Sequence, residues 1–412
     1  MLSMITCGFP KKTLSLALRR DFSQLLKPRF SKNVSLPKRN APSLNKVTVR
    51  GTSGISEGIS TRAQNIVGGW LIGCAGMCFG AIVIGGLTRL TESGLSMVDW
   101  KLFKDMKPPK SEEEWIEEFE KYKTYPEYQH ILSSGREMTL ADFKFIFYME
   151  FGHRLWGRAT GMVFLLPATF FLYKGWITKA MKPRLALYTA LIGFQGFMGW
   201  YMVKSGLEDK PGVNDVPRVS QYRLAAHLGT AAVLYSLFLW SGMSHLLRDK
   251  FAGARVPNLR TLQKGAHGVT SLIFLTLLSG AFVAGLDAGL VYNTWPKMAD
   301  RWIPSDLLAY SPTWSNFFEN PTTVQFDHRI LGKVTVASVT AFWFMCRAAP
   351  LPPAARKASH ALLAMAFIQM TLGVSTLLTH VHTHVASTHQ AGAITLLSIS
   401  LWLMHILKRI PK

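Results

Sequence analysis

Four histidines in this chain of 412 residues lie in two near-copies of one pattern. His153 belongs to EFGHRLWGR and His328 to QFDHRILGK, and each motif begins an apolar stretch. Farther along, His227 lies in RLAAHLGTAAVLYSLFLW and His389 in STHQAGAITLLSISLWL. A histidine inside an apolar span is costly and by default indicates a functional site. Because imidazole is a standard ligand of haem iron, the pattern predicts haem chemistry.

A repeated glutamine supports an internal duplication. Gln195 lies in GFQGFMGWYMV and Gln369 in AFIQMTLGVSTL, and each follows the first histidine of its copy at almost the same distance in sequence. Such self-similarity is typical of membrane proteins built from two related halves. We therefore interpret the chain as two copies of one helical unit.

Other metals fit these histidines less well. A single buried histidine is more often a hydrogen-bonded core residue, but four in duplicated contexts favour ligands. No carboxylate or thiol cluster joins them, as a zinc or copper site would require. Cys74 and Cys78 share one helical face, yet two thiols alone are a weak metal signal. The spacing of Glu150 and His153 also occurs in di-iron bundles, which need further carboxylates that we do not find in the sequence.

The composition indicates a membrane protein. Hydrophobic residues make up 49% of the sequence, and a stretch of ~20 apolar residues is long enough to cross a bilayer as a helix. Eight such stretches occur, at about 65–90, 144–173, 185–203, 221–247, 265–287, 324–347, 359–379 and 385–407. The sequence therefore predicts an all-α polytopic membrane protein, with eight transmembrane helices in two pseudo-symmetric four-helix bundles. We expect the N-terminal half at residues 61–250 and the C-terminal half at residues 251–412.

A basic leader precedes the first apolar stretch. Up to residue 50 its only acid is Asp21, and its basic residues are Lys11, Lys12, Arg19, Arg20, Lys27, Arg29, Lys32, Lys38, Arg39, Lys46 and Arg50. Such a leader predicts a mitochondrial transit peptide and disordered segment over residues 1–60. The alternative is a disordered basic tail held near anionic lipid. The leader carries much of the net charge of +22, and the topology accounts for the rest, so nucleic acid is not a predicted partner.

The loops differ in the sign of their charge. Basic residues follow the second, fourth and sixth stretches and the C-terminal one, and they include Lys174, Lys179, Lys182, Arg184, Arg248, Lys250, Arg255, Arg260, Lys264, Arg347, Arg356, Lys357, Lys408, Arg409 and Lys412. The positive-inside rule places these loops and both termini in the matrix. The loop with SEEEWIEEFEKYK then faces the intermembrane space, as an amphipathic helical cap or as a solvated charged segment.

This topology brings the four histidines to a similar depth. The second, fourth, sixth and eighth stretches enter from the intermembrane space, and each histidine lies within about the first ten residues of its helix. Helical bundles hold cofactors between facing helices. We therefore expect His153 to face His227 and His328 to face His389, each pair binding one haem iron.

Two further groups of histidines are predicted to be interfacial. One precedes the last apolar stretch and consists of His380, His382 and His384. The other lies near the matrix ends of helices and consists of His245, His267 and His360. For the first group the alternative is that one member replaces His389 as a ligand.

The two copies differ close to their first histidine. Glu150 shares a helical face with His153, three residues on, whereas the second copy has Gln325. A carboxylate can exchange protons or stabilise positive charge, which a neutral amide cannot. We therefore predict a reactive haem with Glu150 as the catalytic residue in the first half, and a resident electron-transfer haem in the second. The alternative is that Glu150 is an interfacial acid paired with Arg154 or Arg158.

The chain resembles the haem A synthases of the mitochondrial and alpha-proteobacterial type. The resemblance covers about residues 64–407 and rests on GGLTRLTESGLSMVDW, EFGHRLWGR, QYRLAAHLG, FDHRILGK and STHQAGA. It implies an eight-helix enzyme of the mitochondrial inner membrane that oxidises a peripheral methyl of haem O to the formyl group of haem A for cytochrome c oxidase. Successive oxygen-dependent hydroxylations would be followed by loss of water. Some bacterial members carry a cysteine pair in the first outer loop, which this chain lacks between Asp99 and Phe143.

The resemblance also implies roles for residues and partners. His153 and His227 flank the substrate haem O. His328 and His389 bind haem B, and Glu150 is the acid required for turnover. A ferredoxin-type protein would donate electrons, and haem O synthase, cytochrome c oxidase assembly factors and a second copy of the chain are candidate partners. The residues alone leave two other classes open, a diheme electron-transfer cytochrome and a haem chaperone or transporter without catalysis.

Overall fold

The computed structural model describes residues 58–411, apart from residues 98, 100–106, 209–217, 248–250 and 252–253. Within this part of the chain the regular structure is helical, with one isolated bridge between Met298 and Arg301. Residues 1–57 of the predicted leader lie outside the described part of the chain. The all-α class predicted from the sequence is confirmed.

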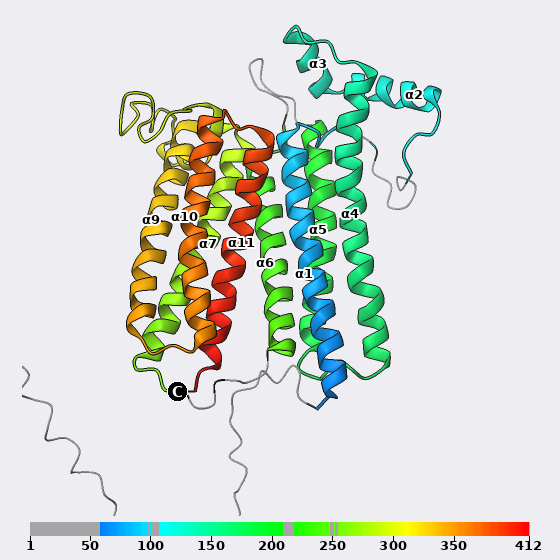
Figure 1. The fold of residues 1–412 in the computed structure, drawn as a ribbon. Coiled ribbons are helices and arrows are strands. Elements are labelled where there is room, and N and C mark those ends of the chain that lie inside the picture. Colours follow the sequence, from blue (N-terminus) through cyan, green and yellow to red (C-terminus); the bar gives the residue numbers. More distant parts are fainter. Residues whose placement is uncertain are drawn as a thin grey trace, which may run out of the picture. The chain divides into compact units, whose positions relative to one another are not determined.

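Within the described residues, eight long helices stand side by side (Figure 1). They are α1 (Thr61–Leu90), α4 (Leu140–Tyr173), α5 (Lys182–Glu208), α6 (Gln221–Leu246), α7 (Leu259–Gly285), α9 (Pro321–Ala348), α10 (Pro353–Leu378) and α11 (Thr383–Arg409). Shorter elements connect them, namely α2 (Glu112–Lys123), α3 (Pro126–Ser133), η2 (Ala288–Leu290), η3 (Thr313–Ser315) and α8 (Asn316–Glu319). Every apolar stretch predicted from the sequence corresponds to one long helix.

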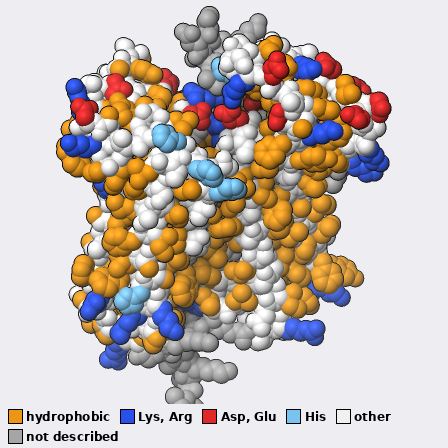
Figure 2. Space-filling model, turned by 45° about the horizontal axis from the view of Figure 1, so that its top comes forward, with side chains coloured by type: hydrophobic (Ala, Val, Ile, Leu, Met, Phe, Trp, Pro, Cys, Tyr) orange, Lys and Arg blue, Asp and Glu red, His pale blue; other side chains and the backbone are white. Residues whose placement is uncertain are grey.

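Seven of these helices are long and apolar enough to cross a membrane, which confirms a polytopic membrane protein. The exception is α5, which does not meet this criterion. The count of eight membrane spans therefore stays a prediction. Figure 2 shows hydrophobic side chains over the middle of the visible face, with charged groups gathered at its two ends.

Capping residues fix the start of the two helices that carry His153 and His328. Thr139 and Asp142 form a reciprocal capping box at the start of α4. At the start of α9 the Asn320 side chain accepts a hydrogen bond from the N–H of Thr322, and Pro321 occupies the first helical position. Both helices thus begin at a defined residue, which sets the register of the histidines that follow.

The packing follows the duplication. Helix α1 packs against α4 and α6, and its counterpart α7 packs against α9 and α11. The halves meet through α1 with α11 and through α6 with α7. One continuous hydrophobic core includes Leu71 of α1, Phe164 of α4, Ile273 of α7 and Leu397 of α11. The two predicted bundles therefore share their core, and the boundary at residue 250 stays a prediction.

The acidic segment after α1 forms a helical cap at one end of α4 (Figure 1). In α2 the apolar side chains of Trp115 and Phe119 pack against Phe143 and Phe147 of α4, whereas most of the glutamates are exposed. Ser111 caps α2, and three glutamates in its first turn match the helix dipole. The prediction of an amphipathic cap is confirmed, and the alternative of a solvated segment is wrong.

Candidate functional site

A cavity of about 1690 Å³ opens between the long helices of both halves. All four predicted ligands, His153, His227, His328 and His389, line it, and so does Glu150. Its volume exceeds the ~300–1,000 Å³ typical of a site for one small molecule. The structure therefore brings all the predicted site residues to the wall of one space that is large enough for more than one ligand.

The second-half histidines face each other across this cavity. The ring centroids of His328 on α9 and His389 on α11 are 6.4 Å apart, with an angle of 83° between the planes. That gap can be spanned by one metal ion with metal–nitrogen bonds of ~2.0–2.1 Å. The nearest glycines make room for the rings, because a Cβ on Gly280 would lie 3.2 Å from His328, and one on Gly373 2.9 Å from His389.

Hydrogen bonds fix the orientation of these two rings. Ser279 Oγ and His328 Nδ1 share a bond of 2.7 Å, and Gln369 Nε2 lies 3.0 Å from His389 Nδ1. A metal-ligating imidazole donates its Nδ1–H to such a partner, and Ser279 Oγ can accept it from His328. Gln369 Nε2 is itself a donor, so it fixes the position of the His389 ring without accepting from it. The 6.4 Å spacing fits two imidazoles that would hold one haem iron.

The first-half histidines are held less firmly. The Nδ1 atoms of His153 on α4 and His227 on α6 are buried and have no hydrogen-bond partner among the described residues. Gly85 of α1 lies against the first ring, since a Cβ there would come within 2.7 Å of His153 Cε1. Buried imidazoles without partners suit ligands of a group that binds between them, so this pair also fits a haem.

The duplicated glutamines brace the helices that carry the second histidine of each pair. Gln369 Nε2 donates to the main-chain oxygen of His389 at 2.8 Å, and Gln195 Nε2 donates to that of His227 at 3.2 Å. Gln195 also donates to Thr230. The repeat in the sequence thus corresponds to one repeated contact, whose role the sequence did not reveal.

Glu150 holds the loop that follows α1. Its Oε2 accepts hydrogen bonds from the Ser96 hydroxyl at 2.7 Å and the Met97 N–H at 2.8 Å. Its Oε1 pairs with Arg154 at 2.6 Å, and Arg154 also donates to the oxygens of Met97 and Asp99. Both Glu150 and Arg154 are buried. The ion pair with Arg154 is the one that the structural alternative predicted.

We call such a pair of side chains that holds a loop a clamp. The second copy has an equivalent clamp, in which an amide replaces the carboxylate. Gln325 Nε2 donates to the carbonyl oxygens of Ala288 at 2.7 Å and Tyr292 at 3.2 Å. Arg329 donates to the oxygens of Tyr292 and Thr294. Each half therefore uses a pair of side chains four residues apart to hold the loop that leaves its first helix.

Two further histidines of the described residues line the cavity, His130 of α3 and His380. His380 has a left-handed backbone, with φ 52°. The rings of His382 and His384 lie 5.6 Å apart and tilted by 40°, outside the cavity. The choice of His389 as the ligand stays a prediction, which the distance of its ring from His328 supports. His245, predicted to be interfacial, is instead buried, with its Nδ1 2.8 Å from the main-chain oxygen of Ser241.

An acid of the cap also lines the cavity. Glu127 of α3 accepts a hydrogen bond from the Tyr122 hydroxyl at 3.1 Å. Burial raises the pKa of Glu127 to about 8, and the nearby carboxylates of Glu150 and Glu92 act in the same direction. The cap thus adds a group that takes up protons near neutral pH.

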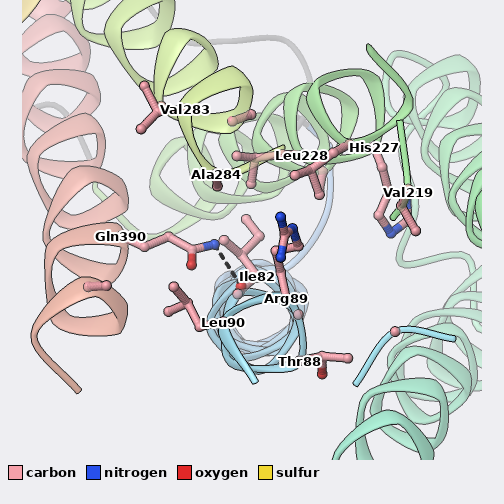
Figure 3. A pocket seen from close by; sticks show the side chains of 18 of the residues that line it. Ile82, Thr88, Arg89, Leu90, Val219, His227, Leu228, Val283, Ala284 and Gln390 are labelled. Carbon is pink, nitrogen blue, oxygen red and sulfur yellow. Dashed lines mark hydrogen bonds between the residues drawn. The ribbon is translucent and has the colours of Figure 1, made fainter. Parts of the chain in front are cut away.

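Three charged residues at the seam between the halves were missed by the sequence reasoning. Asp287, which follows α7, pairs with Arg89 of α1 at 2.7 Å and with Arg218, just before α6, at 3.1 Å. All three line the cavity, and Figure 3 shows Arg89 projecting from α1 toward the helices that carry Leu228 and Ala284. They come from three distant segments, so no local motif could have identified them.

The donor set favours haem over a metal held by protein ligands alone. Among the described residues, no group of three or more His, Cys, Asp or Glu side chains converges on one point. Zinc sites usually require at least three protein ligands, whereas a haem iron needs only one or two. Paired imidazoles therefore match haem better than zinc.

Comparisons with known proteins identify the family of the chain. The family described as "Cytochrome oxidase assembly protein" (COX15-CtaA) matches residues 68–401. The chain is 55% identical to "Heme A synthase COX15" of Bos taurus over 354 residues, covering 86% of this chain and 84% of the relative. It is 47% identical to "Heme A synthase COX15" of Arabidopsis thaliana over 350 residues, covering 84% and 76%. It is 43% identical to "Heme A synthase" of Nitrosospira multiformis over 340 residues, covering 82% and 93%. The chain therefore belongs to the COX15-CtaA family of cytochrome oxidase assembly proteins, which includes haem A synthases.

Proposed function

We propose that this chain is a haem A synthase, which converts haem O to haem A for the assembly of cytochrome c oxidase. The observation that carries the proposal is that two pairs of histidines, one from each half, line a single cavity in a member of this family. The reaction oxidises a methyl group of the substrate to an alcohol, then to a gem-diol that loses water to give the formyl group. Each hydroxylation consumes oxygen, electrons and protons and releases water.

The two pairs of histidines divide the work. We assign haem O to His153 and His227, and a resident haem B to His328 and His389. The second pair is braced at Nδ1 by Ser279 and Gln369, which suits a group that stays. The first pair has no such partner among the described residues, which suits a molecule that enters and leaves. When bound, haem B supplies one-electron transfer.

Glu150 is proposed as the residue required for turnover. It lies on the cavity wall, where a carboxylate can move protons or stabilise positive charge. Its bonds to Ser96, Met97 and Arg154 also support a positioning role for the loop that borders the first-half site. The variants Glu150→Gln and Ser96→Ala separate the two roles.

The proposed setting is the mitochondrial inner membrane. We place both termini in the matrix and the haem sites toward the intermembrane space, because the loops on the other side are basic. A ferredoxin-type protein supplies electrons, and haem O synthase supplies the substrate. The cap of α2 and α3 would then lie in the intermembrane space.

Extraction of haem from the purified protein, followed by chromatographic separation, tests the function. A haem A synthase retains haem O, a hydroxylated intermediate or haem A together with haem B. A diheme electron carrier would yield haem B alone. A haem chaperone or transporter would yield haem O without oxidised products, even when oxygen and reductant are supplied. Either of these two results would overturn the proposal.

A further inference from the structure

Two arginines share one carboxylate at the seam between the halves. Arg89 donates to Asp287 Oδ1 at 2.7 Å, and Arg218 donates to Oδ2 at 3.1 Å. The three side chains are partly exposed to the cavity that they line. With two positive charges against one negative charge, the cluster carries a surplus positive charge where it faces the cavity.

Neighbouring acids do not remove this surplus. Glu127 of the cap interacts electrostatically with Arg89. Its pKa is raised to about 8, which keeps it largely protonated at neutral pH. Glu92 is exposed to solvent, where its charge is screened. The Nε atom of Arg89 is buried and has no hydrogen-bond partner among the described residues. The cluster thus has both unbalanced charge and an unused donor.

The position of Arg89 relates the cluster to the first-half site. Gly85, four residues earlier on α1, touches the ring of His153. Residues four apart lie on the same face of a helix, separated by ~6 Å along its axis. Arg89 therefore lies one turn from the level of the His153 ring, toward the end of α1 from which the chain leads to the cap.

We propose that Arg89 and Arg218 form a carboxylate-binding subsite that receives the propionate groups of the tetrapyrrole in the first-half site. The inference rests on the proposed function. The planar guanidinium group binds a carboxylate through two parallel hydrogen bonds, and such charge-assisted bonds are stronger than neutral ones. Asp287 follows α7 in the second half. The subsite therefore links the first-half haem site to the second half of the chain.

Binding of two probes by the purified full-length protein tests the subsite. The probes are haem B and haem B dimethyl ester, which has no propionate charge, and Soret absorbance titration gives their dissociation constants. Arg89→Gln should weaken binding of haem B about tenfold or more, the loss expected for a charge-assisted bond. It should leave binding of the dimethyl ester nearly unchanged. Arg223→Gln is the matched control, since Arg223 lies over the Tyr201 ring and does not line the cavity.

Two outcomes would overturn the subsite. Equal weakening of both probes by Arg89→Gln would mean that the cluster only ties the halves together. No change in either probe would mean that it takes no part in binding. A failure of the proposed function gives a different result from a failure of the subsite. In that case the wild-type protein does not bind haem B, or His153→Ala binds it as tightly as the wild type does. The low-spin spectrum of the second-half haem reports on folding in each variant.

Discussion

The carboxylate of Glu150 accepts hydrogen bonds at the position where the amide of Gln325 donates them. Glu150 meets a hydroxyl and an N–H of the loop after α1, whereas Gln325 meets two carbonyl oxygens of the loop after α7. The difference between the two copies therefore matches the backbone that each side chain faces. A substitution that exchanges acceptor for donor at Glu150, or donor for acceptor at Gln325, leaves buried polar groups without a matching hydrogen-bond partner.

Glu150→Gln should lower haem A formation by on the order of a hundredfold. It removes the negative charge beside Arg154 and leaves a buried guanidinium without its ion pair, which is strongly destabilising for a local structure. The second-half haem should stay bound, and haem O or a partly oxidised intermediate should accumulate. Chromatography of extracted haems measures each species. Near-normal haem A formation would reduce Glu150 to a structural acid.

Ser96→Ala separates positioning from proton chemistry at Glu150. It removes one hydrogen bond to the carboxylate and keeps the carboxylate itself. If the main task of Glu150 is to hold the loop, haem A formation should fall in the same direction as in Glu150→Gln, by a smaller factor. Unchanged turnover in Ser96→Ala combined with loss in Glu150→Gln would assign the effect to the ionisable group. Gln325→Glu is the matched control and should damage the second-half spectrum instead.

His328→Ala and His389→Ala should each abolish the low-spin b-type spectrum. The two rings are 6.4 Å apart, and each would supply one axial bond to the same iron. His380→Ala and His384→Ala serve as controls and should keep that spectrum. Retention of a normal spectrum by His389→Ala together with its loss in His380→Ala would reassign the ligand to the loop before α11.

Gly85→Ala should weaken haem binding in the first half. Alanine normally stabilises a helix by ~1 kcal/mol over glycine, but here the new methyl would lie 2.7 Å from the His153 ring and force it to move. Gly76→Ala on the same helix is the control, because a Cβ there meets nothing within 4 Å. Titration with haem B measures the difference, and equal affinities for the two variants would contradict the contact.

The cap should become less stable as the pH rises from about 4.5 to about 8. The pKa of Glu127 is raised from 4.5 to about 8 in the fold, so the folded cap binds the proton more tightly than the unfolded one. This stabilisation is complete below pH 4.5 and is lost as pH approaches 8. Limited proteolysis between pH 5 and pH 9 should therefore accelerate with pH. Glu127→Gln should flatten the profile, and an unchanged profile would exclude Glu127 as its cause.

Orientation in the membrane can be tested in mitoplasts. Protease added from outside should cleave the cap near Glu113 and spare the loop with Lys179 and Lys182, if the basic loops face the matrix. Permeabilised mitoplasts provide the control in which both loops are cleaved. Cleavage at Lys179 while the matrix remains sealed would invert the topology.

The sequence predicted the helices and the histidines because both depend on local patterns. A run of apolar residues predicts a membrane helix. The duplicated motifs place His153 and His328 at equivalent positions on α4 and α9. It gave the pairing of Glu150 with Arg154 as an alternative, but it did not predict that Glu150 and Gln325 hold loops. Their other partners are mostly main-chain groups whose direction depends on loop conformation. The contact of Arg89 with Asp287 also escaped it, because residues from both halves meet only in the folded chain.

The side chain of Gln390 on α11 donates to the carbonyl oxygen of Ile82 on α1 at 3.0 Å (Figure 3). This contact joins residues 308 positions apart, between the first and the last of the long helices. When the chain enters the membrane from its N-terminus, α1 is inserted before α11, so one side of α1 lacks its neighbour until insertion is nearly complete. A chain that stops before residue 383 would leave the seam open and present an unfinished membrane protein to proteolytic quality control.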